Sequence, residues 1–139
     1  MTIAIEGGAP LIQVFDMPRT IAFWRFLGFE VAMSSGEAGD DDVDWVLLRH
    51  GGCELMLNTM YERGARPAAP DPARVAAHAD TCLFLGCRDL DAAYTELRAR
   101  GVAAEPPVVR PYGMRQLSFS DPDGYGVCLQ WRAGGAGPG

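Results

Sequence analysis

The stretch Leu11-Ile12-Gln13-Val14-Phe15-Asp16 begins a pattern that the chain uses twice: an apolar strand, an Asp, a helix, a Gly and a second strand. The second copy begins at Cys82-Leu83-Phe84-Leu85-Gly86-Cys87-Arg88-Asp89. Helices are predicted over residues 18–27 and 90–100, each opened by the Asp and ended by a Gly. One short helix on a few strands leaves an apolar face uncovered. We therefore expect the two copies to pair and to create a cleft.

Three further strands complete each copy. After the first helix they are expected over residues 29–33, 45–49 and 53–58, and after the second over residues 108–109, 115–120 and 125–131. The segment Asp121-Pro122-Asp123-Gly124 is a strong hairpin signal. Its Pro and the lack of a Glu at the loop's end argue against a calcium loop. The chain is thus expected to consist of two βαβββ modules over residues 1–60 and 80–132, a linker at 61–79 and a flexible tail at 133–139.

The composition is that of an ordinary globular protein, with 48% hydrophobic and 22% charged residues in a chain of 139. The formal net charge of −6 argues against a nucleic-acid partner, which needs clustered basic side chains, and would suit a cationic small molecule. No apolar run is long enough to span a membrane, and the N-terminal segment lacks the basic residues of a secretory signal. We expect a cytoplasmic protein without a membrane partner, whose four cysteines are free thiols.

Two segments of the chain resemble a known family. They are Phe23-Trp24-Arg25-Phe26-Leu27-Gly28-Phe29-Glu30-Val31 and Asp121-Pro122-Asp123-Gly124-Tyr125-Gly126-Val127-Cys128-Leu129-Gln130. They look like the hallmark segments of the glyoxalase, bleomycin-resistance and extradiol-dioxygenase superfamily, also called the vicinal oxygen chelate fold, and the resemblance covers residues 9–131. It implies an α+β fold in which two βαβββ modules form curved mixed sheets around a cleft, with the helices on the outer face. It also implies a homodimer.

The resemblance further implies four metal-ligand positions, one on the first and one on the last strand of each module. The matching residues here are Ala9, Met56, Cys82 and Cys128. A hard divalent ion prefers imidazole and carboxylate donors, which Ala cannot supply and Met replaces only with a soft thioether. We therefore expect neither a metal nor another cofactor. A soft-metal or redox pair of Cys82 and Cys128 stays open beside the simpler interpretation that both thiols are packing groups.

Other residues offer weaker candidates for chemistry. Glu54 is a candidate for a catalytic residue, as a general base if burial raised its pKa, although a strand-surface carboxylate in water is preferred. The acidic run at residues 40–44 could steer a cation, but a solvated hairpin tip is the better interpretation. His50 and His78 are expected to be exposed or capping groups. Trp24 is expected in the core, whereas Trp45 is a candidate for stacking on a ligand.

The residues expected to bind a ligand combine apolar walls with a few amides, as in pockets for small molecules. They are Trp45, Met56, Cys82, Phe84, Tyr112, Gln116, Cys128 and Gln130. The sequence thus predicts a metal-free protein of the bleomycin-resistance type that binds a small organic ligand and sequesters a drug or toxic metabolite, as in antibiotic resistance. The alternative is an enzyme of the same fold, a lyase or isomerase using Glu54 or a thiol-dependent enzyme. A metal-dependent glyoxalase or dioxygenase is the least favoured.

Overall fold

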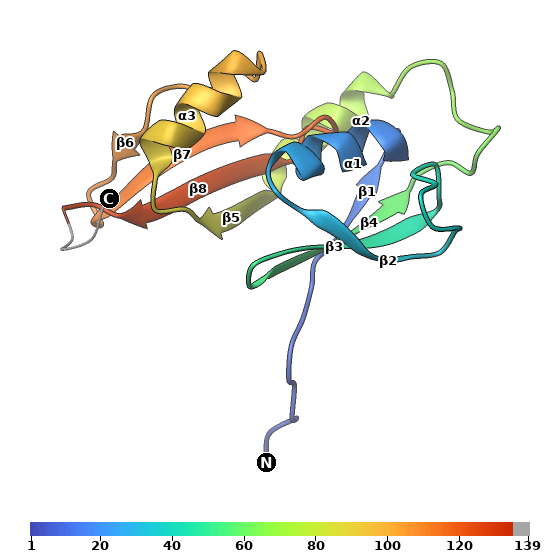
Figure 1. Ribbon diagram of the computed structural model, residues 1–139, viewed down its shortest axis with the longest axis horizontal. Helices are drawn as coiled ribbons and strands as arrows, with labels where there is room; N and C mark the ends of the chain where they lie inside the picture. Colours follow the sequence, from blue (N-terminus) through green and yellow to red (C-terminus); the bar gives the residue numbers. More distant parts are fainter. Residues whose placement is uncertain (135–139) are drawn as a thin grey trace. The chain divides into compact units, whose positions relative to one another are not determined.

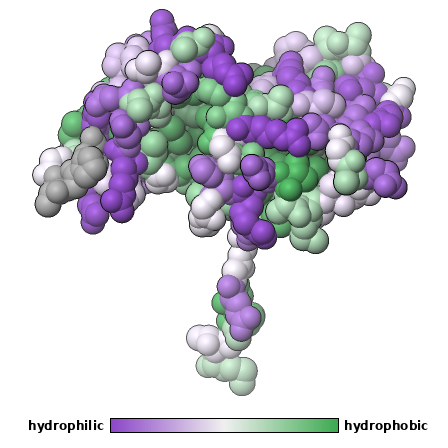
Figure 2. All heavy atoms as spheres, in the orientation of Figure 1, coloured by the Kyte–Doolittle hydropathy of each residue, from purple (hydrophilic) through white to green (hydrophobic). Residues whose placement is uncertain are grey.

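The computed structural model describes residues 1–134 and divides into two compact units, the second of which begins at Asp71 (Figure 1). Residues 135–139 of the expected tail lie outside the described residues. Residues 1–10 form an extended arm that leaves the first unit ahead of its first strand (Figures 1 and 2). Within residues 1–134, no helix is long and apolar enough to cross a membrane.

The first unit is a four-stranded mixed sheet with one helix. Strand β1 (Leu11–Val14) leads into helix α1 (Met17–Phe26), and β2 (Glu30–Ser34), β3 (Trp45–His50) and β4 (Cys53–Thr59) follow. The strand order is β1-β4-β3-β2, with β1 parallel to β4 and the other pairs antiparallel. The predicted βαβββ order is confirmed, with element ends shifted by a residue or two.

The second unit repeats this plan. Strand β5 (Cys82–Gly86) leads into α3 (Leu90–Ala99), followed by β6 (Val108–Val109), β7 (Met114–Ser120) and β8 (Gly126–Arg132). The order β5-β8-β7-β6, with β5 parallel to β8, matches that of the first sheet. The α+β class with two mixed sheets is confirmed, and neither sheet closes into a barrel.

Local signals explain both long helices. The carboxylate of Asp16 accepts a hydrogen bond from the backbone N–H of Arg19, and that of Asp89 accepts one from Ala92, so each Asp is the N-cap of its helix. Gly28 and Gly101 follow the helices with positive φ angles of 104° and 78°, a conformation that glycine adopts without steric cost. The repeated Asp and Gly therefore fix both ends of each helix.

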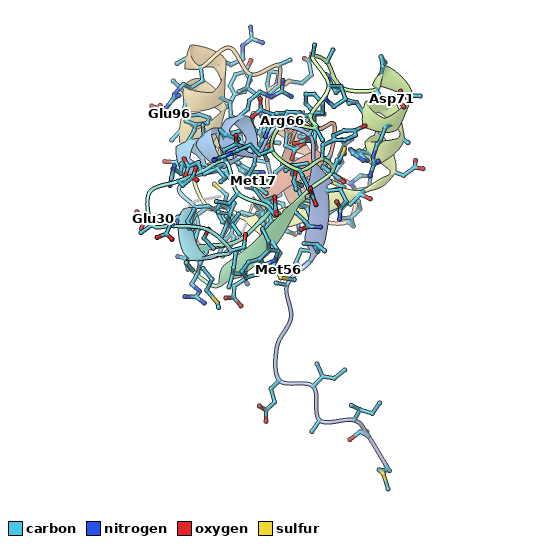
Figure 3. All side chains as sticks on the ribbon, turned by 90° about the vertical axis from the view of Figure 1, so that its right-hand side faces the viewer. Met17, Glu30, Met56, Arg66, Asp71 and Glu96 are labelled. Carbon is cyan, nitrogen blue, oxygen red and sulfur yellow. The ribbon has the colours of Figure 1, made fainter. Side chains whose placement is uncertain are left out.

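Each helix covers one face of its sheet with apolar side chains. In the first unit the fully buried residues include Met17, Ile21 and Trp24 from α1 and Leu48 and Leu57 from the sheet, and α1 packs against β4. Figure 3 shows Met17 in this interior. In the second unit the corresponding side chains are Leu90, Leu97, Leu117 and Val127. The expectation that Trp24 is a core residue is confirmed.

The segment expected to be a linker contains regular structure that the sequence analysis did not assign. Helix α2 (Pro72–Ala77) and a 3₁₀ turn, η1 (His78–Asp80), precede β5. Asp71 accepts a hydrogen bond from the N–H of Ala73, and Pro72 occupies the first helical position. The run of alanines and prolines hides the apolar periodicity here, but the cap and the Pro mark the helix start.

The acidic run at residues 40–44 is not the solvated hairpin tip that the sequence suggested. Arg25 forms a bidentate ion pair with Asp41, Arg63 contacts Asp40 and Asp42, and Arg66 lies 2.6 Å from Asp42. Val43, within the run, is only 8% exposed. The Arg66 hydrogen bond, with charge attraction from Arg63 as well, holds the pKa of Asp42 below its usual range. These arginines neutralise much of the charge that could have steered a cation.

Candidate functional site

Each sheet has one face covered by its helix and one face that we call the open face. On the first open face lie Leu11, Gln13, Met33, Trp45, Leu47, Glu54, Met56 and Asn58. On the second lie Cys82, Phe84, Gln116, Ser118, Cys128 and Gln130. Side chains of neighbouring residues in a strand point to opposite faces, and the buried Leu55 and Leu57 on either side of Met56 show this alternation.

The first open face carries an apolar row that crosses the whole sheet. Leu11, Met56, Leu47 and Met33 are direct neighbours in register on β1, β4, β3 and β2. The outer two, Leu11 and Met33, are 48% and 56% exposed. Figure 3 shows Met56 at the edge of the side chains, away from the interior that holds Met17. Trp45 lies on the adjacent row, opposite Asn58, and is half-buried.

Glu54, the candidate general base, is an ion-paired surface carboxylate. Its Oε2 atom accepts hydrogen bonds from Nε and Nη2 of Arg49 on the neighbouring strand, at 3.0 and 2.7 Å. Both side chains are partly exposed, at 34% and 55%. A general base must be able to accept a proton from a substrate, whereas this carboxylate already accepts two hydrogen bonds from Arg49 at the surface of the sheet. The geometry therefore favours the strand-surface interpretation of Glu54.

The second open face carries a hydrogen-bonded network of side chains. The Oε1 atom of Gln116 accepts from the hydroxyl of Tyr112 (3.1 Å) and from Nε of Arg110 (3.3 Å). Its amide nitrogen donates to Oε1 of Gln130 at 2.9 Å. Gln116 is only 8% exposed, whereas Phe84 and Tyr112 are 57% and 68% exposed. An ordered amide pair thus lies beside two exposed aromatic rings.

A tight turn between β6 and β7 places two members of this network. Gly113 donates a backbone hydrogen bond to the carbonyl of Arg110, and the N–H of Arg110 donates to the carbonyl of Met114. Gly113 has a φ of 87°, as in a type I turn followed by a left-handed residue. Because the turn is short, Arg110 and Tyr112 both reach back over Gln116. Sequence reasoning missed Arg110, although the Pro-Tyr-Gly run that follows it signals the turn.

Cys82 and Cys128 lie on adjacent parallel strands of the second sheet. Cys82 pairs with Gly126, two residues from Cys128, and a Cβ placed on Gly126 would lie 3.3 Å from the Cys82 sulfur. Cys128 is 2% exposed, and Cys82 is exposed. The atoms packed around the sulfur raise the pKa of the Cys82 thiol, and nearby Cys128 raises it further. This is the reverse of what an activated thiol requires.

The donor set at the implied metal positions does not fit a hard divalent ion. Met56 lies on the first open face and Cys82 and Cys128 lie on the second, with Ala9 just before β1. None of the four supplies an oxygen or imidazole ligand. Among residues 1–134 there is also no group of three or more His, Cys, Asp or Glu side chains arranged to hold a metal. These residues therefore give no basis for metal-dependent chemistry at the four positions.

The structure places every predicted ligand-binding residue on an open face or its rim, each within its own unit. Trp45 and Met56 belong to the first unit, and the remaining six belong to the second. Both histidines are placed away from the open faces. His50 is the exposed last residue of β3, and its ring packs edge-on against Phe29. His78 stacks on Tyr125, with ring centroids 4.1 Å apart, and its Nδ1 donates to the carbonyl of Asp123 at 2.6 Å.

Comparisons with known proteins agree with this architecture. A bleomycin-binding protein solved with bleomycin is 20% identical over 92% of this chain and 99% of its own, with a TM-score of 0.65. A bleomycin resistance determinant from transposon Tn5 gives the same identity and TM-score, covering 92% of this chain and 98% of its own. A glyoxalase/bleomycin resistance protein/dioxygenase from Nocardioides, also 20% identical, covers 99% of this chain and 91% of its own, with a TM-score of 0.66. At this identity the likeness shows the fold alone.

Sequence comparison identifies the family directly. A search of the curated proteins found no match. The family described as Glyoxalase/Bleomycin resistance protein/Dioxygenase superfamily matches residues 8–129, which is most of the chain. Both hallmark segments fall almost entirely inside this range. The chain belongs to the glyoxalase, bleomycin-resistance and dioxygenase superfamily.

Proposed function

We propose that the protein binds a small organic molecule on the open faces of its sheets, without a metal, and acts by sequestering it. The observation that supports this most is the second open face, which carries both the exposed rings of Phe84 and Tyr112 and the Gln116–Gln130 amide pair. Apolar walls with a few oriented polar groups are typical of ligand sites. Bleomycin, the ligand of one similar structure, belongs among the compounds to be tested.

The enzymatic alternatives have less support. The Glu54 carboxylate already accepts two hydrogen bonds from Arg49, and a raised pKa keeps the Cys82 thiol protonated at neutral pH. The donor set at Ala9, Met56, Cys82 and Cys128 also gives a metal-dependent glyoxalase or dioxygenase the weakest basis. A cytoplasmic location, a homodimer and a role in antibiotic resistance stay predictions.

A binding and recovery experiment tests the proposal. The protein is titrated by calorimetry with a panel of aromatic compounds of different charge, including bleomycin. Each compound is then recovered, and its molecular mass is measured by mass spectrometry. We expect saturable binding of at least one compound, recovered unchanged, and a loss of affinity of about tenfold in Phe84→Ala, because a buried ring contact is removed. Val109→Ala is the control, since Val109 is exposed to a similar degree on the opposite face of the sheet. Conversion of the compound, or no binding across the panel, would contradict sequestration.

A further inference from the structure

We infer that the second open face selects an organic anion: an aromatic or apolar molecule that carries a carboxylate or a similar acceptor group. This inference rests on the proposed function, adds the charge and polarity of the ligand, and departs from the cationic ligand that the net charge of the chain suggested. It depends on the direction of each hydrogen bond in the Arg110–Tyr112–Gln116–Gln130 network. That direction decides which groups are left to face a ligand.

The orientation of Gln116 follows from its partners. A guanidinium nitrogen can only donate, so the atom that faces Arg110 must be the amide oxygen. The hydroxyl of Tyr112 donates to the same oxygen. The amide nitrogen of Gln116 then faces Gln130 and must donate to its oxygen. Two donors on one oxygen thus fix both amides in a single arrangement.

This arrangement leaves donors facing outward. The oxygen of Gln130 is occupied, so its NH₂ group is the part that remains for a ligand. Arg110 uses only Nε in the network, which leaves both terminal nitrogens of its guanidinium available. No Asp or Glu in residues 1–134 forms an ion pair with Arg110. A guanidinium group without a carboxylate partner can donate two parallel hydrogen bonds to the carboxylate of a ligand.

The surroundings agree with this polarity. The side chains of β5, β7 and β8 on the open face are Cys82, Phe84, Met114, Gln116, Ser118, Ser120, Cys128, Gln130 and Arg132, and none of them is a carboxylate. The exposed rings of Phe84 and Tyr112 supply apolar area for the body of the ligand. The acidic excess of the whole chain does not oppose this, because most of it lies in the first unit: residues 1–70 hold 10 acidic and 5 basic residues, whereas residues 71–139 hold 8 acidic and 7 basic residues.

Three probes with one ring system test the inference: 2-naphthoate, 2-naphthamide and 2-naphthylmethylammonium. Each is titrated into the full chain, labelled with ¹⁵N, while the side-chain amide signals of Gln116 and Gln130 are followed by NMR. We expect naphthoate to shift both signals and to bind about tenfold more tightly than the amide, because it gains charge-assisted hydrogen bonds. The ammonium probe is expected to bind most weakly of the three.

Two variants locate the effect. Arg110→Gln is expected to lower the affinity for naphthoate about tenfold and to leave the affinity for naphthamide unchanged. Arg98→Gln, which removes the same charge from the last turn of α3, is expected to change neither. If the amide or ammonium probe binds as tightly as naphthoate or more tightly, the inference of an anionic ligand is wrong. The proposed sequestration would not be affected by that result. If no probe shifts any open-face signal at millimolar concentration, the inference and the proposed function both fail.

Discussion

The two units have the same strand order and the same capped helix, yet their open faces differ in chemistry. The first presents a row of aliphatic and thioether side chains, with a single ion pair between Arg49 and Glu54. The second presents a fixed pair of amides, two exposed rings and Arg110, which forms no ion pair with a carboxylate among residues 1–134. The difference shows that the fold dictates which positions face outward and leaves their chemistry free. We therefore expect the second unit to be the one that recognises a polar group of a ligand.

A second difference lies at the ends of the sheets. In the second unit α2 and η1 pack against the turn between β7 and β8, where His78 contacts Tyr125 and Asp123. In the first unit the equivalent turn, at Gly51 and Gly52, is exposed. We expect substitutions in the turn of the second unit to destabilise the protein more than matched substitutions elsewhere.

Gly124→Ala is expected to give the largest effect. Gly124 has a φ of 88°, and a Cβ there would lie 2.3 Å from the backbone carbonyl oxygen of Val75 in α2. We expect the free energy of unfolding to fall by about 3 kcal/mol, measured by urea denaturation, because strain and a backbone collision add. Gly101→Ala is the control, with a φ of 78° and no atom within 4 Å of its Cβ position. It is expected to lower the same free energy by about 1 kcal/mol, and equal losses would rule out the contact with Val75.

His78→Ala is expected to have the next largest effect. The variant loses the hydrogen bond from Nδ1 to the carbonyl of Asp123, the contact of Nε2 with the Tyr125 hydroxyl and the stacked ring. We expect a loss of about 1–2 kcal/mol in the free energy of unfolding. In the first unit, His50→Ala removes an exposed ring and is expected to cost less than about 1 kcal/mol. The comparison of the turns fails if the His50 variant is the less stable of the two.

The sequence could predict most of the fold because its signals are local. Asp16 and Asp89 mark helix starts, Gly28 and Gly101 mark helix ends, and residues 121–124 form the predicted hairpin, with Gly124 donating to the carbonyl of Asp121. Strand alternation also placed Met56 and Gln130 on the face opposite the helices. These features depend on neighbours within a few residues.

The missed features depend on partners that are distant in sequence. The arginines that hold the acidic run come from α1 and from the segment after β4, so spacing alone cannot reveal them. His78 meets Tyr125 only because α2 packs over the hairpin turn. Arg110 joins Gln116 through a turn whose side-chain directions are set by its backbone geometry. The candidate site was thus predicted as a set of positions, without its hydrogen bonds.

Asp42→Asn tests the paired acidic loop and is expected to have a moderate effect. Asp42 is paired with Arg63 and Arg66, which lower its pKa from 3.8. A lowered pKa in the folded state stabilises the fold above the unfolded pKa, and this contribution is lost as the pH falls below about 4. We expect the variant to lose about 1 kcal/mol at pH 7 and to approach the parent protein as the pH falls through the lowered pKa of Asp42, as measured by thermal unfolding.

Asp91→Asn in the second unit is the matched control for that experiment and the smallest expected effect. Arg115 also lowers the pKa of Asp91 through a hydrogen bond, but the Asp91 side chain is 73% exposed. Water and salt screen such a pair. We therefore expect a smaller change in melting temperature than for Asp42→Asn, in the same direction and with the same loss at low pH. A larger effect at Asp91 would show that burial does not distinguish the two ion pairs.

A calorimetric titration of the metal-depleted protein with Zn²⁺, Mn²⁺ and Ni²⁺ tests whether the protein works without a metal. Ala9, Met56, Cys82 and Cys128 lack the donors that a catalytic cation needs. We predict no stoichiometric binding with a Kd below about 10 μM, a value weak for a dedicated metal site. Stoichiometric binding with a Kd below about 10 μM that is abolished by replacing Met56 or Cys128 would contradict this prediction. A metal-dependent reaction would then become the favoured function.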